Sequence, residues 1–273
     1  MPDLKLRLNK DMLVVAPLLT WRQLDEDMNE GECLEYLNIL DDELILETYR
    51  RYKLAGAQCV CTNTLKANRT ALQAFGLEDA LVDINQAGVM IARDAGFEHI
   101  IATMSLAKEE DLLEQLAALL PEDPEAIWLI GNAEADELNA AIGSIKSQTD
   151  LPLIAAAAAN GITQGADIIY VMGASLKDSL DELRSLAQHY KEPLMICPDP
   201  GTPEGATKIQ RNRAINNLAD DMADFALEAQ ALGAQFVGTA PGSRPVFTGT
   251  AAAILAGMDV VQGDGAGAPH YVG

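Results

Sequence analysis

Polar side chains that could bind or protonate a substrate follow several short apolar runs of this chain. Asn63 and Thr64 come after one run, and Asp199 lies between two prolines after another. A carboxyl group restricted by proline rings suits proton transfer, and amide and hydroxyl groups suit substrate orientation. We predict Asp199 and Asn63 as catalytic residues, with substrate contacts from Thr62, Thr64, Lys66, Ser243 and Arg244.

Each of these residues also has a structural interpretation. Asp199 can serve as a turn or cap residue, and Asn63 and Thr64 can satisfy backbone groups of their own loop. Lys66 can face an anionic ligand or be a solvated loop residue. The pair Ser243-Arg244 can act as an anion clamp or form part of the surface.

The order of apolar and amphipathic segments predicts the fold that positions these groups. Eight short apolar runs alternate with longer segments of helical periodicity, the pattern of a parallel sheet with crossover helices. In a chain of 273 residues this predicts an α/β fold, a (β/α)8 TIM-type barrel, whose chemistry occurs at the carboxyl ends of the strands. The predicted strands are residues 12–18, 58–63, 99–104, 126–130, 153–157, 167–172, 194–197 and 235–238.

Helices are predicted between the strands. The first of them carries an apolar stripe, starts near two aspartates and ends at Gly56. Only residues 158–166 separate the fifth and sixth strands, and Asn160-Gly161 is a turn signal, so this crossover is expected to be shortened. The stripe consists of Leu40, Leu44, Leu46, Tyr49 and Leu54, and the other helices are predicted at residues 68–95, 109–120, 134–146, 176–190, 214–232 and 250–255.

Length, composition and charge narrow the function classes. We expect one barrel domain over residues 1–262 and a flexible Gly-rich tail over residues 263–273. The 41 acidic and 19 basic residues give a formal charge of -22, which disfavours nucleic acid and anionic membranes as partners. No long apolar run or secretory signal is recognisable, so we expect a cytoplasmic protein with a small-molecule substrate and a possible homo-oligomeric state.

The cysteines favour free thiols over a disulfide framework. Cys33, Cys59, Cys61 and Cys197 form no CxxC pair and have no small-scaffold spacing. Cys59 and Cys61 lie two residues apart on one predicted strand, so both face the same side, expected to be the barrel interior. Thiols that fill the core are the favoured interpretation, and a replacement metal site formed by Cys59, Cys61 and Cys197 is the alternative.

Several motifs occur in a recognisable order along the chain. Thr62-Asn63-Thr64 is followed by Ala67-Asn68, and Pro198-Asp199-Pro200-Gly201 follows the seventh predicted strand. This order resembles the homocysteine S-methyltransferase family over roughly residues 12–257, where the corresponding patterns are Glu-Thr-Asn-Thr-Phe-Gly-Ala-Asn and Pro-Asn-Ala-Gly. The resemblance implies a barrel in which a zinc-bound thiolate accepts a methyl group.

The departures from that family fall on its functional positions. By the resemblance, Gly173 replaces one zinc cysteine, and Ala240 and Pro241 replace the other two. Cys61 replaces a glutamate that holds the amino-acid substrate in the family. Alanine and proline have no side-chain donor atom, so the resemblance implies that the three-thiolate zinc site and homocysteine binding have been lost.

The sequence therefore predicts an altered, zinc-independent one-carbon (methyl) transfer with a substrate other than homocysteine. No tightly bound cofactor or metal is expected, and a corrinoid protein or a pterin is the possible methyl carrier. The alternatives are a noncatalytic binding or assembly subunit that kept the fold, and a homocysteine enzyme with relocated zinc ligands.

Overall fold

The computed structural model describes residues 3–24, 31–202, 205 and 207–257 of the chain. The predicted tail at residues 263–273 lies outside these residues. The described strands are β1 (Leu13–Val14), β2 (Cys59–Cys61), β3 (His99–Ser105), β4 (Ala126–Ile130), β5 (Leu153–Ala156), β6 (Ile168–Val171), β7 (Leu194–Ile196) and β8 (Ala234–Val237).

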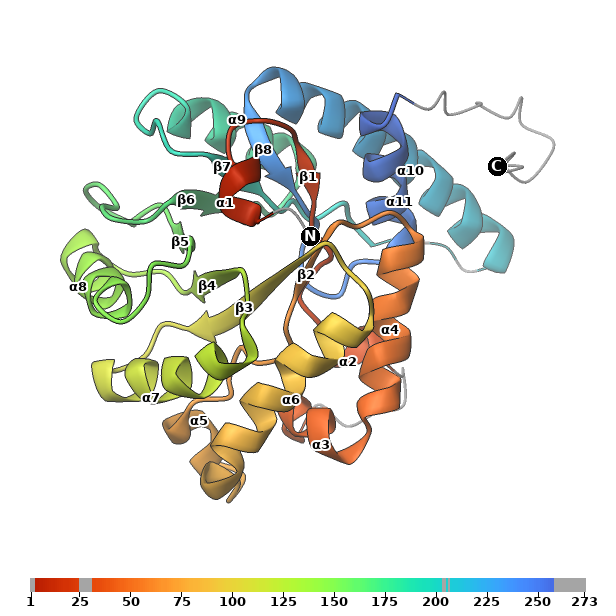
Figure 1. Cartoon of the computed structure of the whole chain (residues 1–273). Coiled ribbons are helices and arrows are strands. Elements are labelled where there is room, and N and C mark those ends of the chain that lie inside the picture. The colour runs from red at the N-terminus through yellow and green to blue at the C-terminus, as the bar shows by residue number, and fades with distance from the viewer. Residues whose placement is uncertain (1–2, 25–30, 203–204, 206, 258–273) are drawn as a thin grey trace.

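The strands form one parallel sheet in the order β1-β8-β7-β6-β5-β4-β3-β2. The two ends of this order, β1 and β2, meet and close the sheet. There Val15 forms a parallel bridge with Cys59, and the Ala16 N–H donates to the Cys59 carbonyl at 2.9 Å. The predicted (β/α)8 TIM-type barrel is confirmed (Figure 1).

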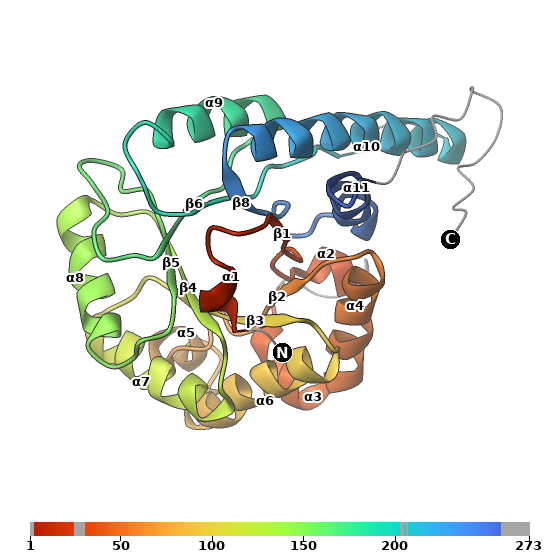
Figure 2. The same cartoon turned by 45° about the horizontal axis from the view of Figure 1, so that its top comes forward.

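Helices surround this sheet on the outside, as Figures 1 and 2 show. The longer ones are α4 (Asp42–Leu54), α6 (Leu81–Asp94), α7 (Glu109–Leu119), α8 (Ala135–Lys146), α9 (Leu176–Leu186), α10 (Lys208–Ala231) and α11 (Pro245–Leu255). The short ones are α1 (Leu4–Arg7), α2 (Trp21–Leu24), α3 (Leu37–Leu40), α5 (Arg69–Gln73) and the 3-10 turns η1 (Leu34–Tyr36), η2 (Glu78–Ala80) and η3 (Leu120–Glu122).

The strands bury side chains on both faces, as expected for a parallel barrel. Trp128 and Tyr170 belong to the apolar cluster inside the barrel, where their rings meet edge to face with centroids 5.2 Å apart. Val60 and Ile127 belong to the cluster between the sheet and the helices. The interior is therefore filled by side chains and leaves the strand ends as the place for a site.

Helix α1 packs against the amino-terminal end of the barrel. Leu4 is completely buried within the interior cluster. The Arg7 guanidinium donates to Glu98 at 2.7 Å and lies 3.3 Å from Nε2 of His99, the first residue of β3. These contacts cover the end of the barrel opposite to that expected for chemistry.

The shortened crossover between β5 and β6 is confirmed. Residues 157–167 contain no helix, and a hydrogen-bonded loop replaces it. The Thr163 hydroxyl donates to the Ala156 carbonyl at 2.8 Å, and the Thr163 N–H donates to the Tyr190 hydroxyl at 3.1 Å. These bonds hold the loop at the strand end without a crossover helix.

The prediction of one helix over residues 68–95 was wrong. The segment forms α5, η2 and α6, because the chain turns at Gly76, whose φ of 69° lies in the left-handed region. Asn68 caps α5, accepting a hydrogen bond from the Ala71 N–H at 2.9 Å. The break allows Asn85 of α6 to donate to the Ala67 carbonyl at 2.7 Å, which ties this helix to the loop after β2.

The apolar stripe predicted for α4 was also partly wrong. Leu40 and Leu54 are 66% and 88% exposed, whereas Tyr49 and Tyr52 are buried. The tyrosines reach the barrel because each hydroxyl has a hydrogen-bond acceptor there; the Tyr49 hydroxyl, for example, donates to the Cys61 carbonyl at 2.9 Å. Aromatic rings with a satisfied polar tip therefore form the inner face of α4.

Two helices begin earlier than predicted. Helix α10 starts at Lys208 because Thr207 and Gln210 form a capping box, and α11 starts at Pro245, whose fixed φ suits the first helical position. The first half of α10 extends beyond the barrel (Figure 2). Its buried residues begin only at Met222.

Candidate functional site

Side chains at the carboxyl end of β2 form a buried hydrogen-bond network. The hydroxyl oxygens of Thr62 and Thr64 are 2.6 Å apart, and Thr64 donates to the Thr103 carbonyl at 2.8 Å. The Thr103 hydroxyl donates to the Thr62 carbonyl at 2.7 Å. All three residues are buried. These bonds join the ends of β2 and β3.

Asn63 anchors the same loop to the segment before α4. Its Nδ2 donates to the Leu34 carbonyl at 2.9 Å and to Oδ1 of Asn38 at 3.0 Å, while Asn38 Nδ2 donates to the Asn63 carbonyl at 2.8 Å. The Lys66 side chain is exposed, and its backbone N–H donates to the Glu35 carboxylate at 2.9 Å. Anchoring of loop backbone was one of the two roles that the sequence left open for Asn63.

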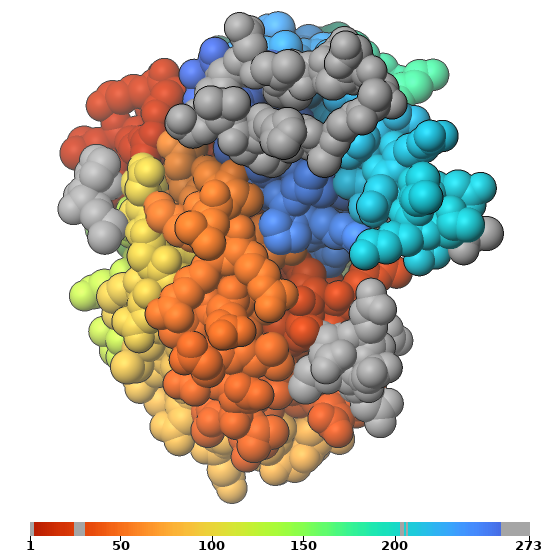
Figure 3. Space-filling model, turned by 90° about the vertical axis from the view of Figure 1, so that its right-hand side faces the viewer, coloured from red at the N-terminus to blue at the C-terminus, as the bar shows by residue number. Residues whose placement is uncertain are grey.

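A second group of predicted residues lies together in a cavity. Asp199, Ser243 and Arg244 line a hollow of about 830 Å³, whose other walls come from α2, α4, α10 and the start of α11. Figure 3 shows this face of the molecule, where α4 (orange), α11 (blue) and the first half of α10 (cyan) lie next to one another. Thr62, Asn63, Thr64 and Lys66 do not line this cavity.

Tyr52 connects three walls of the cavity. Its hydroxyl donates to the Ser243 carbonyl at 2.5 Å and accepts from Nε2 of Gln23 at 2.9 Å. Burial raises the pKa of Tyr52 to about 12, with the Gln23 hydrogen bond and the Arg51 charge opposing that shift. Tyr52 therefore remains a neutral donor at physiological pH and fixes α4 to the segments after β1 and β8.

Asp199 lies where the loops after three strands meet. Its N–H donates to the Gly173 carbonyl at 3.1 Å after β6, and the Ala240 N–H after β8 donates to the Pro198 carbonyl at 2.8 Å. The carboxylate is exposed and accepts a hydrogen bond from the Gly201 N–H at 2.8 Å. Asp199 can therefore stabilise the turn and still present its carboxylate to a ligand.

Three arginines line the cavity, and two of them were missed in the sequence. Arg22 lies on α2, Arg51 on α4, and Arg244 is the N-cap residue of α11. Within the described part of the chain, none of the three forms an ion pair with a carboxylate. Arg22 and Arg51 carried no local signal, because their proximity to Arg244 exists only in the closed barrel.

The cysteine thiols are free and buried. Cys59, Cys61 and Cys197 belong to the cluster inside the barrel, as predicted. Burial raises the pKa of Cys197 to about 12 and raises the pKa of Cys59 and Cys61 well above the ordinary thiol range. Without a metal ion, these thiols therefore stay protonated near neutral pH.

The sequence resemblance sets Gly173, Ala240 and Pro241 against the family's zinc cysteines, and these three positions offer little space or no side-chain donor atom for a metal. A β-carbon on Gly173 would lie 1.9 Å from Oγ and 2.9 Å from Cα of Ser179, a completely buried residue of α9. Ala240 and Pro241 follow β8 and offer no donor atom. Among residues 3–24, 31–202, 205 and 207–257, no group of three or more His, Cys, Asp or Glu side chains is arranged to hold a metal ion.

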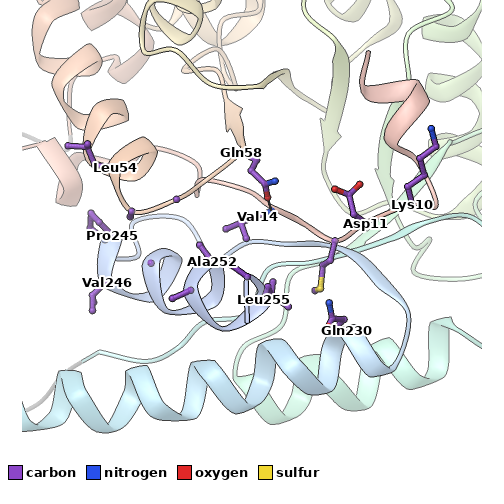
Figure 4. Close-up of a pocket in the computed structure, with 16 residues that line it drawn as sticks. Lys10, Asp11, Val14, Leu54, Gln58, Gln230, Pro245, Val246, Ala252 and Leu255 are labelled. Atoms are coloured by element: carbon purple, nitrogen blue, oxygen red, sulfur yellow. Dashed lines mark hydrogen bonds between the residues drawn. The ribbon is translucent and has the colours of Figure 1, made fainter. Parts of the chain in front are cut away.

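Another cavity, of about 1080 Å³, runs along α11 and shares Pro245 and Val246 with the first (Figure 4). Its lining continues to Leu255 and reaches Lys10 and Asp11 near the start of β1. Lys10 and Asp11 lie on the amino-terminal side of the barrel, away from the strand ends that carry chemistry in this fold.

Comparisons with known proteins agree with this architecture. A family model described as homocysteine S-methyltransferase matches residues 11–115. The metallated form of the homocysteine methyltransferase MmuM from Escherichia coli superimposes with a TM-score of 0.72 at 16% identity, over 90% of this chain and 96% of that one. Residues 11–115 are therefore similar to this family, and the chain shares the barrel fold of that enzyme. The predicted resemblance to this family is confirmed.

The chain also matches part of two longer proteins. Methionine synthase of Mycobacterium leprae is 25% identical over 85% of this chain, and methionine synthase of Mycobacterium tuberculosis is 25% identical over 86%. The chain spans 23% of the length of each of these relatives. In the described part of the barrel, no helix has the length and apolar character needed to cross a membrane.

Proposed function

We propose that this barrel transfers a methyl group without a three-thiolate zinc site and acts on a substrate other than homocysteine. The observation that carries the proposal is the crowding at Gly173, where a cysteine side chain would collide with Ser179 at its first atom. Ala240 and Pro241 support it, because neither side chain can bind a metal. The three core thiols support it further, because burial favours their protonated, less nucleophilic form.

The substrate in this proposal is a small molecule held in the cavity between the β7 and β8 loops. Ser243 and Arg244 contact it, and Asp199 exchanges a proton with it, since all three residues line that cavity. Thr62, Asn63 and Thr64 fix the β2 side of the barrel mouth through their buried bonds, and Lys66 adds an exposed cation beside them.

A separate carrier supplies or accepts the methyl group in this proposal, either a corrinoid protein or a pterin. The barrel then accelerates the reaction mainly by holding two reactants in a reactive geometry. The four free thiols agree with a reducing, cytoplasmic location, which is part of the proposal.

The test combines metal analysis with turnover. We expect purified protein to contain no stoichiometric zinc, cobalt or iron, and methyl transfer from methylcobalamin or a methylated pterin to survive chelation. We expect Asp199→Asn to lower turnover by about 100-fold or more, as for loss of a general acid or base. Asp83→Asn, on the exposed side of α6, is the matched control. Stoichiometric zinc together with chelator-sensitive methylation of homocysteine would refute the proposal.

A noncatalytic assembly subunit is the second candidate, and the projecting half of α10 favours it. Ile209 is 68% exposed, and Lys208, Arg211 and Arg213 lie on the same projecting part. A subunit that only assembles would give no turnover with either carrier and would bind a partner through this helix. Loss of partner binding in Ile209→Asp, with an unchanged melting temperature, would establish this role.

A further inference from the structure

We propose that the cavity beside the β8 loop binds the oxyanion group of a small ligand, a carboxylate or a phosphate, through Arg22, Arg51 and Arg244. The inference rests on the proposed function in taking this cavity as the substrate site, and it extends that function by naming the substrate class. The observation behind it is that Arg22, Arg51 and Arg244 all line this one cavity.

The charge of the cavity is opposite to that of the chain. The whole protein has 41 acidic and 19 basic residues, yet the described residues that line this cavity include three arginines and one carboxylate, Asp199. A concave site lined by one sign of charge concentrates ligands of the other sign. Because the protein has a formal charge of -22, we interpret this local group of arginines as a site for an anion.

Two other cavities lack this feature among their described lining residues. The cavity along α11 is lined by one cation and one anion, Lys10 and Asp11. Another, of about 440 Å³, adds Lys191 and Glu192 to the same two residues. The described charges balance in both of these cavities, whereas arginines are in excess in the cavity at the carboxyl ends of β7 and β8.

The chemistry of arginine defines the ligand class. A guanidinium group presents paired N–H donors that match the two oxygens of a carboxylate or phosphate. The three groups come from α2, α4 and the N-terminus of α11, and the start of a helix adds a positive dipole end that favours an anion. Tyr52 holds these three elements together through Gln23 and the Ser243 carbonyl. The walls are therefore positioned before a ligand binds.

The chain offers a matched pair of variants on α4. Arg51 lines the cavity, whereas its neighbour Arg50 does not and instead lies 3.5 Å from the Glu43 carboxylate. Arg51→Ala and Arg50→Ala remove the same charge from adjacent exposed positions of one helix. Arg244→Ala tests a second wall of the cavity and does not depend on α4.

The experiment is calorimetric titration of the full chain with inorganic phosphate and, separately, with succinate at low ionic strength. We expect saturable binding of at least one of these anions, and the stronger of the two identifies the oxyanion. Arg51→Ala and Arg244→Ala should each weaken it by about tenfold or more, as for loss of a charge-assisted hydrogen bond. Arg50→Ala should leave affinity within about twofold, since a remote exposed charge is screened.

Two results would overturn the inference. One is the absence of saturable binding by both anions. The other is an equal loss in Arg50→Ala and Arg51→Ala, which would indicate general surface charge. The titration contains no methyl donor, so the anion site can stand if methyl transfer fails, and methyl transfer can stand if neither anion binds.

Discussion

Replacing Gly173 with alanine tests the crowding beside this residue, on which the proposed zinc-independent chemistry depends. The new β-carbon would lie 1.9 Å from Ser179 Oγ, well inside van der Waals contact, and 2.9 Å from the Ser179 Cα. Rotation of the hydroxyl alone cannot relieve the second contact, so α9 or the loop after β6 must move. That movement also breaks the 2.7 Å bond from the Ser179 hydroxyl to the Ser175 carbonyl.

The loss of stability combines the cost of the steric overlap with the cost of the broken hydrogen bond. Overpacking in a buried site costs about 1–3 kcal/mol, and the lost hydrogen bond about 0.5–1.5 kcal/mol. We therefore expect Gly173→Ala to lower the free energy of unfolding by about 1.5–4.5 kcal/mol. Gly173→Cys begins with the same atom and should cost at least as much.

Gly143 provides a control, because alanine at this position should raise the free energy of unfolding instead of lowering it. It lies on the exposed side of α8, and a β-carbon there meets no atom within 4 Å. Gly143→Ala should stabilise the protein by about 0.5–1 kcal/mol, since alanine is the better helix former. Urea denaturation of both variants and the parent measures the difference. A neutral or stabilising Gly173→Ala would refute the argument, because a cysteine would then fit where the family has one.

Two further predictions concern the β2 loop and the core thiols. Asn63→Ala leaves the Leu34 carbonyl and Asn38 without their hydrogen-bond donor and should lower the free energy of unfolding by about 2–4 kcal/mol. Asn139→Ala loses hydrogen bonds in an exposed setting and should lower it by less than about 1 kcal/mol. Equal urea midpoints for the two variants would contradict the anchoring role of Asn63. Burial raises the pKa of Cys197 from its ordinary 9.0 to about 12, so the folded state keeps a proton that the unfolded state loses. Stability should be independent of this thiol below about pH 9 and fall as the pH rises toward 12, and native thiols should react with Ellman's reagent only after unfolding. Rapid labelling of all four thiols in the native protein would contradict their burial.

The strands were predictable because each is a short apolar run that needs burial on both faces. Every predicted strand overlaps an observed one, and β4 (Ala126–Ile130) has the predicted bounds. The eightfold alternation with helical segments then leaves few topologies other than a barrel. The short crossover after β5 was also readable, because too few residues separate the two strands to form a helix.

Helix boundaries and inward faces were less predictable, because they depend on contacts distant in sequence. The break at Gly76 was missed since a left-handed glycine does not alter the apolar pattern around it. Leu54 fitted a helical stripe but lies 88% exposed, whereas Tyr52 is buried because Ser243 and Gln23 offer it hydrogen bonds. Neither partner is adjacent to Tyr52 in the chain.

The sequence by itself determined the barrel and its resemblance to the homocysteine S-methyltransferases. Those properties depend on local pattern and residue identity. The tertiary structure decided which side chains come together. It placed Asn63 in a buried hydrogen-bond network, and it brought Asp199 and Ser243 into one cavity that Arg22 and Arg51 also line. Proximity across a closed barrel depends on where β1 meets β8, and no local pattern encodes which side chains face one another there.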